Sequence, residues 1–144
     1  MKIYIINGPN LNMLGIREPN LYGHTDYREL TGQLTRYAEE KQIELILCQS
    51  NHEGCLVDKI QEAYFEKCDG IVLNPGAYTH TSIALLDALK AVGIPTVEVH
   101  ISDISRREDF RKISYIRPAC VASVIGHGTQ GYFEAIDILM KRCC

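Results

Sequence analysis

Five short apolar runs alternate with stretches of helical periodicity along this chain, and this alternation restricts its fold more than any other feature. The runs are rich in valine, isoleucine and leucine without clean two-residue alternation, which is typical of strands buried on both faces. The expected strands span residues 3–7, 43–49, 70–74, 96–100 and 121–126. Strands that alternate with helices predict a parallel sheet with helices on both faces. For a chain of this size we expect a flavodoxin-like α/β three-layer sandwich with a five-stranded parallel sheet of order 2-1-3-4-5.

The helical stretches have recognisable ends. Asp26 and Glu29 are placed like a capping box before the first helix, and Ser105 with Glu108 repeats this pattern before a short fourth one. Thr81-Ser82 opens the third helix, and Gly93 is expected to end it. With 144 residues and no linker, repeat or low-complexity segment, the chain is predicted to form one domain, residues 1–144.

The composition excludes several classes of protein. A chain with 46% hydrophobic and 23% charged residues is typical of soluble globular proteins, and no apolar run approaches the ~18 residues that a membrane helix needs. The net charge of −3 gives no reason to expect nucleic acid or an acidic membrane as a partner. The N-terminus enters a strand without a cleavage-site pattern, so the cytoplasm is the expected location.

The six cysteines show neither a C-x-x-C pair nor metal-ligand spacing, and reduced thiols are expected. The pattern leaves the redox behaviour of the terminal Cys143-Cys144 pair open.

A long connection, residues 10–24, separates the first strand from the first helix. Connections of 2–6 residues are typical in α/β domains, and longer ones are usually lids or binding loops. This loop carries Arg17 and Tyr22 beside glycine and proline hinges. We therefore expect a mobile lid over a strand end that brings a cation and a phenol to a substrate.

Polar side chains follow all five expected strands at their carboxyl ends, where open parallel sheets bind ligands. His100 is the strongest single candidate for acid–base chemistry, because the near-neutral pKa of histidine suits it to protonate a leaving group. Glu98 lies two residues earlier and shares a face of the strand, from which it can orient the imidazole. A structural histidine at a strand end is the alternative.

Tyr22 is a candidate base only if its surroundings stabilise the phenolate. A phenol has a pKa near 10, and lowering it by about three units requires roughly 4 kcal/mol. One guanidinium about 6 Å away contributes roughly 2.8 kcal/mol at an effective dielectric of ~20, so Arg17 and Arg107 together suffice. Spacing alone favours the alternative, in which Tyr22 packs over the site.

Two further patterns have both a plain and a functional interpretation. Basic residues cluster between 106 and 117 with Glu108 and Asp109 among them, and composition favours a solvated helix face over a site for a small anion. Residues 126–131 match G-x-G-x-x-G, but no strand and no ribose-binding acidic residue follow, so we interpret them as a tight turn into the last helix. His24, His52 and His127 show no metal-ligand spacing.

The motifs also form an ordered set that spans nearly the full chain. They are Ile-Asn-Gly-Pro-Asn-Leu at 6–11, Arg-Glu-Pro at 17–19 with Tyr22-Gly23, Gln-Ser-Asn at 49–51 with Glu53-Gly54, Leu-Asn-Pro-Gly at 73–76, Thr-His-Thr-Ser at 79–82, Glu-Val-His-Ile-Ser at 98–102, Arg107, Phe-Arg at 110–111, and Gly126, Gly128, Gln130, Gly131 and Tyr132. This set resembles the type II 3-dehydroquinate dehydratases (type II dehydroquinases).

The resemblance implies reversible dehydration of 3-dehydroquinate to 3-dehydroshikimate, by anti elimination through an enolate. This is the third step of the shikimate pathway and also occurs in quinate breakdown. Tyr22, as a phenolate held by Arg17 and Arg107, would remove a proton from the carbon beside the ketone. Asn10 would position a water against the enolate oxygen. His100, oriented by Glu98, would protonate the departing hydroxyl.

The resemblance also implies a set of substrate contacts and an assembly. The substrate carboxylate would be held by Asn74, Ser102 and the amide of Ile101, the ring hydroxyls by His80 and Arg111, and Asp87 would reach the site of a neighbouring subunit. No metal, nicotinamide or other cofactor is expected. The family assembles as a homododecamer, a tetramer of trimers.

Two non-catalytic classes are weaker alternatives. A flavodoxin-like module for FMN or phosphate needs a hydroxyl- and glycine-rich loop after the first strand, where this chain has Asn-Gly-Pro-Asn. A receiver-like signalling domain needs acidic residues after the first strand and an aspartate after the third, where Asn7 and Asn74 stand.

Overall fold

Five parallel strands form the central sheet. The computed structural model describes residues 1–16, 18–22 and 24–143, and for Pro19 and Tyr22 it describes the backbone alone. The strands are β1 (Lys2–Asn7), β2 (Glu44–Gln49), β3 (Gly70–Asn74), β4 (Thr96–His100) and β5 (Ala122–Ile125). Their order is β2-β1-β3-β4-β5, and every pairing is parallel. This confirms the predicted sheet and its strand order.

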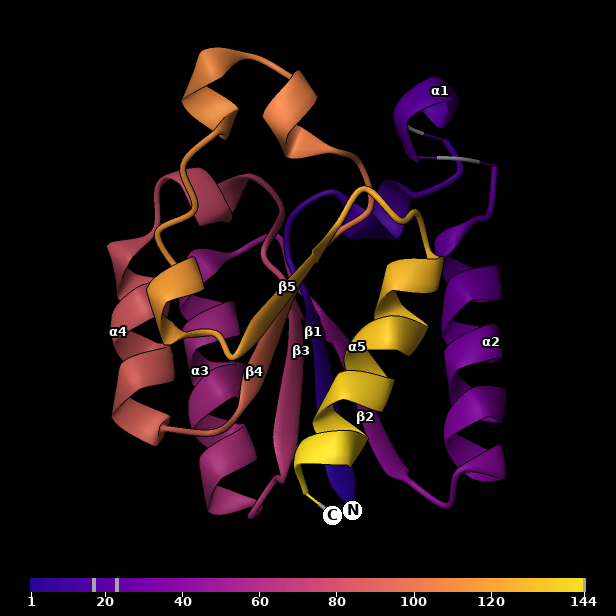
Figure 1. Ribbon diagram of the computed structural model, residues 1–144, viewed down its shortest axis with the longest axis vertical. Coiled ribbons are helices and arrows are strands. Elements are labelled where there is room, and N and C mark those ends of the chain that lie inside the picture. The colour runs from indigo at the N-terminus through magenta and orange to yellow at the C-terminus, as the bar shows by residue number, and fades with distance from the viewer. Residues whose placement is uncertain (17, 23, 144) are drawn as a thin grey trace.

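Helices cover both faces of the sheet (Figure 1). On one face lie α2 (Tyr27–Glu40) and α5 (Gln130–Arg142), and on the other lie α3 (Glu53–Phe65) and α4 (Ile83–Val92). The apolar stripe of each helix packs on the sheet, so two separate cores form, one on each side. None of the described helices is long and apolar enough to cross a bilayer.

Local sequence signals set several of these helix ends. The Asp26 carboxylate accepts a hydrogen bond from the Glu29 amide at 2.7 Å, and the Ser82 hydroxyl accepts one from the Leu85 amide at 3.0 Å. Gly93 ends α4 in the left-handed conformation, with φ of 64°. These caps confirm three of the predicted helix boundaries.

The predicted capping box at Ser105 is wrong. The segment after β4 forms two 3-10 turns, Ile104–Arg106 and Asp109–Arg111, instead of a helix that begins after Ser105. Asp103 precedes the first turn, and its carboxylate accepts a hydrogen bond from the Ser105 amide at 3.1 Å. Asp103 therefore caps two residues earlier than the sequence pattern suggests, and Glu108 lies between the two turns.

The carboxyl edge of the sheet, at the top of Figure 1, brings the loops after β1 and β3 into direct contact. The Gly8 amide donates to the Asn74 carbonyl at 2.7 Å. A Cβ atom on Gly8 would lie 2.5 Å from the carbonyl oxygen of Pro75, well inside van der Waals contact. The glycine thus permits the two loops to approach, and together they form one side of the pocket described next.

Candidate active site

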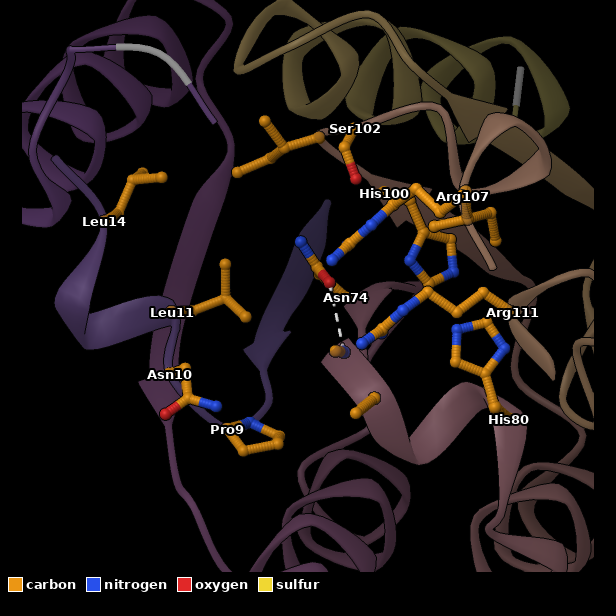
Figure 2. A pocket seen from close by; sticks show the side chains of 14 residues that line it. Pro9, Asn10, Leu11, Leu14, Asn74, His80, His100, Ser102, Arg107 and Arg111 are labelled. Carbon is orange, nitrogen blue, oxygen red and sulfur yellow. Dashed lines mark hydrogen bonds between the residues drawn. The ribbon is translucent and has the colours of Figure 1, made fainter. Parts of the chain in front are cut away.

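A pocket opens at the carboxyl edge of the sheet, between the loop that follows β1 and the segment that follows β4. Figure 2 shows the basic side chains of His80, His100, Arg107 and Arg111 grouped on one side, with Pro9, Asn10, Leu11 and Leu14 opposite. Asn74 lies between the two groups, and Gly76, Ala77, Ile101, Ser102 and Ile104 complete the lining. Among the described residues no acidic side chain lines this pocket. The lining therefore favours an anionic ligand that also has an apolar surface.

Glu98 lies directly behind the pocket and is fully buried. Its carboxylate accepts hydrogen bonds from five side chains, all between 2.7 and 3.0 Å. The donors are Thr79, His100 and Ser114 to Oε1, and Arg117 and Ser123 to Oε2. A buried carboxylate requires such compensation, because it has lost its hydration shell.

These contacts keep Glu98 ionised. Burial by itself raises the pKa of the carboxyl, but the hydrogen bonds from His100 and Ser114 and the charge of Arg117 outweigh burial. The pKa of Glu98 is therefore held well below its ordinary value of 4.5. A permanent negative charge stands next to His100.

The hydrogen bond to Glu98 fixes the orientation of His100. The distance between His100 Nε2 and Glu98 Oε1 is 2.7 Å. Because an ionised carboxylate only accepts, Nε2 carries a proton, and Nδ1 is the ring nitrogen left for a ligand. His100 lines the pocket and is 5% exposed. This geometry can deliver a proton from Nδ1 into the pocket while Glu98 balances the charge of the ring.

His80 is arranged in the opposite sense. Its Nδ1 lies 2.7 Å from the carbonyl oxygen of Ile113, so Nδ1 carries the proton of the neutral ring. Burial, together with the nearby charges of His100 and Arg111, lowers the pKa of His80 despite this backbone hydrogen bond. A neutral ring with a proton on Nδ1 leaves Nε2 as an acceptor, which suits a hydroxyl group of a ligand.

Arg107, directly after the first 3-10 turn, and Arg111, at the end of the second, bring positive charge to the pocket. Their side chains are 13% and 20% exposed, and both approach Glu108, at 3.9 and 2.7 Å. Arg107 also lines a second cavity beside the pocket, which it shares with Asn20 and Leu21 of α1 (Pro19–Tyr22). The basic cluster is thus not one solvated helix face, and for Arg107 and Arg111 that interpretation is wrong.

Residue Asn10 presents its side chain to the pocket from a left-handed backbone conformation, with φ of 68°. The backbone N–H of Asn10 donates a hydrogen bond to Asn51 Oδ1 at 3.0 Å, so the loop after β2 holds the loop after β1 in place. Leu11 and Leu14 are buried beneath this part of the chain. The first half of the long loop is therefore anchored to the core.

The family model described as dehydroquinase class II matches residues 1–140, which is nearly the whole chain. The chain belongs to the class II dehydroquinase family.

Individual relatives match this chain along nearly its full length. A 3-dehydroquinate dehydratase of Fusobacterium nucleatum is 56% identical over 143 residues, covering 98% of this chain and 97% of that protein. The crystal structure of type II dehydroquinase from Butyrivibrio crossotus superposes with a TM-score of 0.96 at 55% identity, covering 97% of both chains. The Propionibacterium acnes type II dehydroquinase gives a TM-score of 0.93 at 36% identity, covering 97% of this chain and 96% of that one.

The dehydroquinase pocket brings together most of the predicted site residues. The eight that line it are Asn10, Asn74, His80, His100, Ile101, Ser102, Arg107 and Arg111. Glu98 supports His100 from behind. Asp87 lies apart, exposed on α4. Arg17 and the side chain of Tyr22 lie outside the described residues, so the predictions for them stay predictions.

The strand ends converge less completely than predicted. The ends of β1, β3 and β4 line the dehydroquinase pocket. The end of β2 supports it through Asn51, and Gly126, Gly128 and Thr129 after β5 line the second cavity. The glycine-rich stretch is a tight turn into α5, as predicted, with positive φ at Gly126 and Gly128.

Sequence reasoning missed several partners of the site. Ser114, Arg117 and Ser123 hold Glu98, and Tyr132 contacts Asn74 from α5. Arg117 appeared only as part of the basic cluster, where composition favoured a solvated face, and Tyr132 appeared in the motif set without an assigned role. A buried glutamate on a central strand was the available clue, because it demands nearby donors.

Proposed function

We propose that this chain catalyses the reversible dehydration of 3-dehydroquinate to 3-dehydroshikimate, in the shikimate pathway or in quinate breakdown. The observation that carries the proposal is His100, backed by the buried carboxylate of Glu98 at 2.7 Å, in a pocket lined by basic side chains. The relative from Fusobacterium nucleatum carries the name of this activity. We assign this activity to a single domain, residues 1–144.

The first chemical step is removal of a proton from the carbon beside the ketone, for which Tyr22 is the proposed base. Arg17 and Arg107 are proposed to stabilise its phenolate. In support, Arg107 lines a cavity together with Asn20 and Leu21, the two residues that precede Tyr22 in α1. The resulting enolate oxygen would receive a hydrogen bond from a water held by Asn10.

In the second step the enolate expels a hydroxyl group, which leaves as water once it is protonated. His100 is the proposed acid, because Nδ1 is the nitrogen that Glu98 does not occupy. Glu98 would keep the ring in position and balance its positive charge before the transfer. The proton moves from His100 to the leaving oxygen, and the reverse reaction returns it.

The remaining lining residues are proposed to hold the substrate. Asn74, Ser102 and the amide of Ile101 would bind its carboxylate, and His80 and Arg111 its ring hydroxyls. Support comes from the acceptor on His80 Nε2 and from the 20% exposure of the Arg111 side chain in a pocket that it lines. A hydroxyl can donate to His80 and accept from Arg111 at once.

We also propose the homododecamer, a tetramer of trimers, in which Asp87 approaches the pocket of a neighbouring subunit. Asp87 lies apart from the pocket of its own chain, and Ile83 on the same helix is 56% exposed. We expect light scattering to give a mass close to twelve times 16.2 kDa. A monomer at assay concentration would contradict this assembly.

A spectrophotometric assay tests the proposed activity. Purified protein mixed with 3-dehydroquinate should produce the ultraviolet absorbance of a conjugated enone, without added metal or cofactor. The rise should survive EDTA, and also borohydride treatment in the presence of substrate, because the proposed route forms no imine with a lysine. Folded protein that gives no rise would overturn the proposal.

A further inference from the structure

Three buried side chains form a hydrogen-bonded chain behind the pocket. Asn7 ends β1 and Asn74 ends β3, and the two stand opposite each other in the sheet register. Tyr132 reaches them from the first turn of α5 and is completely buried. Asn74 Nδ2 lies 2.9 Å from the Tyr132 hydroxyl, which lies 2.6 Å from Asn7 Oδ1. This chain is referred to below as the Asn7–Tyr132–Asn74 relay.

The relay has a direction. The Tyr132 hydroxyl has one proton and donates it to the carbonyl oxygen of Asn7, so its oxygen accepts from the Asn74 amide nitrogen. Burial raises the pKa of Tyr132 far above its usual range, so the hydroxyl keeps this proton at any assay pH. On the other side, the Gly76 amide donates to Asn74 Oδ1 at 3.2 Å.

The two contacts of Asn74 decide which end of its amide is available. Gly76 N–H can only donate, so it fixes the carbonyl oxygen, and the Tyr132 oxygen fixes the nitrogen. One hydrogen of Nδ2 is used by Tyr132, and the second remains for a ligand in the pocket that Asn74 lines. A flipped amide would instead present its carbonyl oxygen there, which repels an anion.

We propose that Tyr132 is a positioning residue that acts through Asn74, holding its amide so that it donates to the substrate carboxylate. The inference rests on the proposed function, which places that carboxylate at Asn74. Tyr132 itself does not touch the substrate, because it is completely buried and does not line the pocket. Its contribution belongs to binding of the carboxylate, because Asn74 is proposed to hold that group and is assigned to neither proton transfer.

The test is a cycle of variants. Tyr132→Phe should raise KM for 3-dehydroquinate about tenfold, which corresponds to about 1.4 kcal/mol, and change kcat less than about threefold. Asn74→Ala should raise KM at least as much. The double variant should have a KM less than about twofold above that of Asn74→Ala alone, because the residue through which Tyr132 acts is gone. Tyr37→Phe, which removes a hydroxyl from the contact with Asp137 elsewhere on α5, is the matched control.

A second variant keeps the test decisive if Tyr132→Phe folds poorly. Asn7→Ala removes the acceptor of the Tyr132 proton, so the hydroxyl turns toward Asn74 and favours the flipped amide. It should therefore also raise KM, although the tyrosine is intact. If Tyr132 has a purely structural role, each substitution should lower the thermal stability and leave KM unchanged.

Equilibrium binding separates this inference from the proposed function. Calorimetry should show that Tyr132→Phe weakens binding of quinate by the same factor as KM, and binding of its uncharged methyl ester much less. Wild-type enzyme that turns over 3-dehydroquinate, with KM unchanged in Tyr132→Phe and Asn7→Ala, overturns the inference alone. Wild-type protein that neither turns over 3-dehydroquinate nor binds quinate overturns the proposed function and the inference with it.

Discussion

Replacing Glu98 by glutamine should destabilise the protein by about 3–5 kcal/mol, the usual cost of breaking a buried charge pair by removing one partner. For a chain of this length that loss lowers the unfolding midpoint by on the order of 10 °C. Turnover should fall about a hundredfold or more, because the imidazole that Glu98 orients is the proposed acid. Thermal unfolding and the enone assay measure the two effects separately.

The size of the effect follows from the donors around the carboxylate. If the amide oxygen of a glutamine faces His100, its NH₂ group faces Arg117 Nε, which is also a donor and lies 3.0 Å from Glu98 Oε2. If the amide is turned round, the NH₂ group faces His100 Nε2, which must then accept. One orientation leaves two donors in conflict, and the other changes the tautomer of the proposed acid.

The His127–Glu134 pair offers a matched control. It has the same chemistry and a nitrogen–oxygen distance of 2.8 Å, but its side chains are 55% and 39% exposed. Glu134→Gln should cost less than about 1 kcal/mol, as exposed pairs do. Equal destabilisation by the two substitutions would contradict the view that burial makes Glu98 important.

The pH dependence of stability gives an independent check. The pKa of Glu98 in the folded protein lies below its ordinary 4.5, so its contribution is complete above that pH and is lost as the pH falls below it. The stability difference between wild type and Glu98→Gln should therefore be constant near neutrality and shrink below about pH 4.5. A difference that grows on acidification would show that the carboxyl is protonated when folded.

The fold was largely predictable because most strands and helices carry a recognisable local sequence pattern. β1 and β3 contain continuous apolar runs, and the helices around them carry caps such as Asp26 and Ser82. Strand ends moved by a residue where a partner strand decides them, as at Lys2, which pairs with Glu44. The turns after β4 were not predicted. Asp103 caps the first turn there, although the sequence pattern pointed to Ser105 as the cap of a helix.

The pocket was predictable in part, for a topological reason. Parallel strands deliver their carboxyl ends to one edge, so polar residues such as Asn74 and His100 were expected to meet. The partners of Glu98 were not expected, because Ser114 and Arg117 belong to a segment whose path no periodicity determines. Tyr132 was part of the motif set, but its contact with Asn74 was not expected, since an aromatic residue on an apolar helix face usually indicates core packing alone.

Replacing Tyr22 by phenylalanine should lower turnover by about a thousandfold or more while leaving substrate affinity within a few-fold. Only the phenol oxygen is lost, and proton transfer by a positioned group contributes typically 10²- to 10⁴-fold. The aromatic ring itself is kept, so binding of 3-dehydroquinate, measured by calorimetry, should persist. Loss of turnover with affinity retained is the signature expected of a lost base.

The prediction depends on a phenol that is acidic enough to act near neutral pH. Lowering a pKa from about 10 to 7 requires roughly 4 kcal/mol, which two guanidinium groups at about 6 Å can supply. Arg107, whose side chain is 13% exposed beside α1, is one of the two proposed. Arg17→Ala should accordingly raise the apparent pKa of the basic group in the pH profile of kcat/KM.

Tyr64→Phe is the appropriate control, because Tyr64 is 55% exposed at the end of α3 and does not line the pocket. Its turnover should match wild type. Near-normal turnover in Tyr22→Phe would remove Tyr22 from the role of base, and neutral His80 or the water proposed to bind Asn10 would then be the groups to examine. Loss of affinity equal to the loss of turnover would instead show that Tyr22 closes the site over the substrate, the packing role that its spacing in the sequence favours.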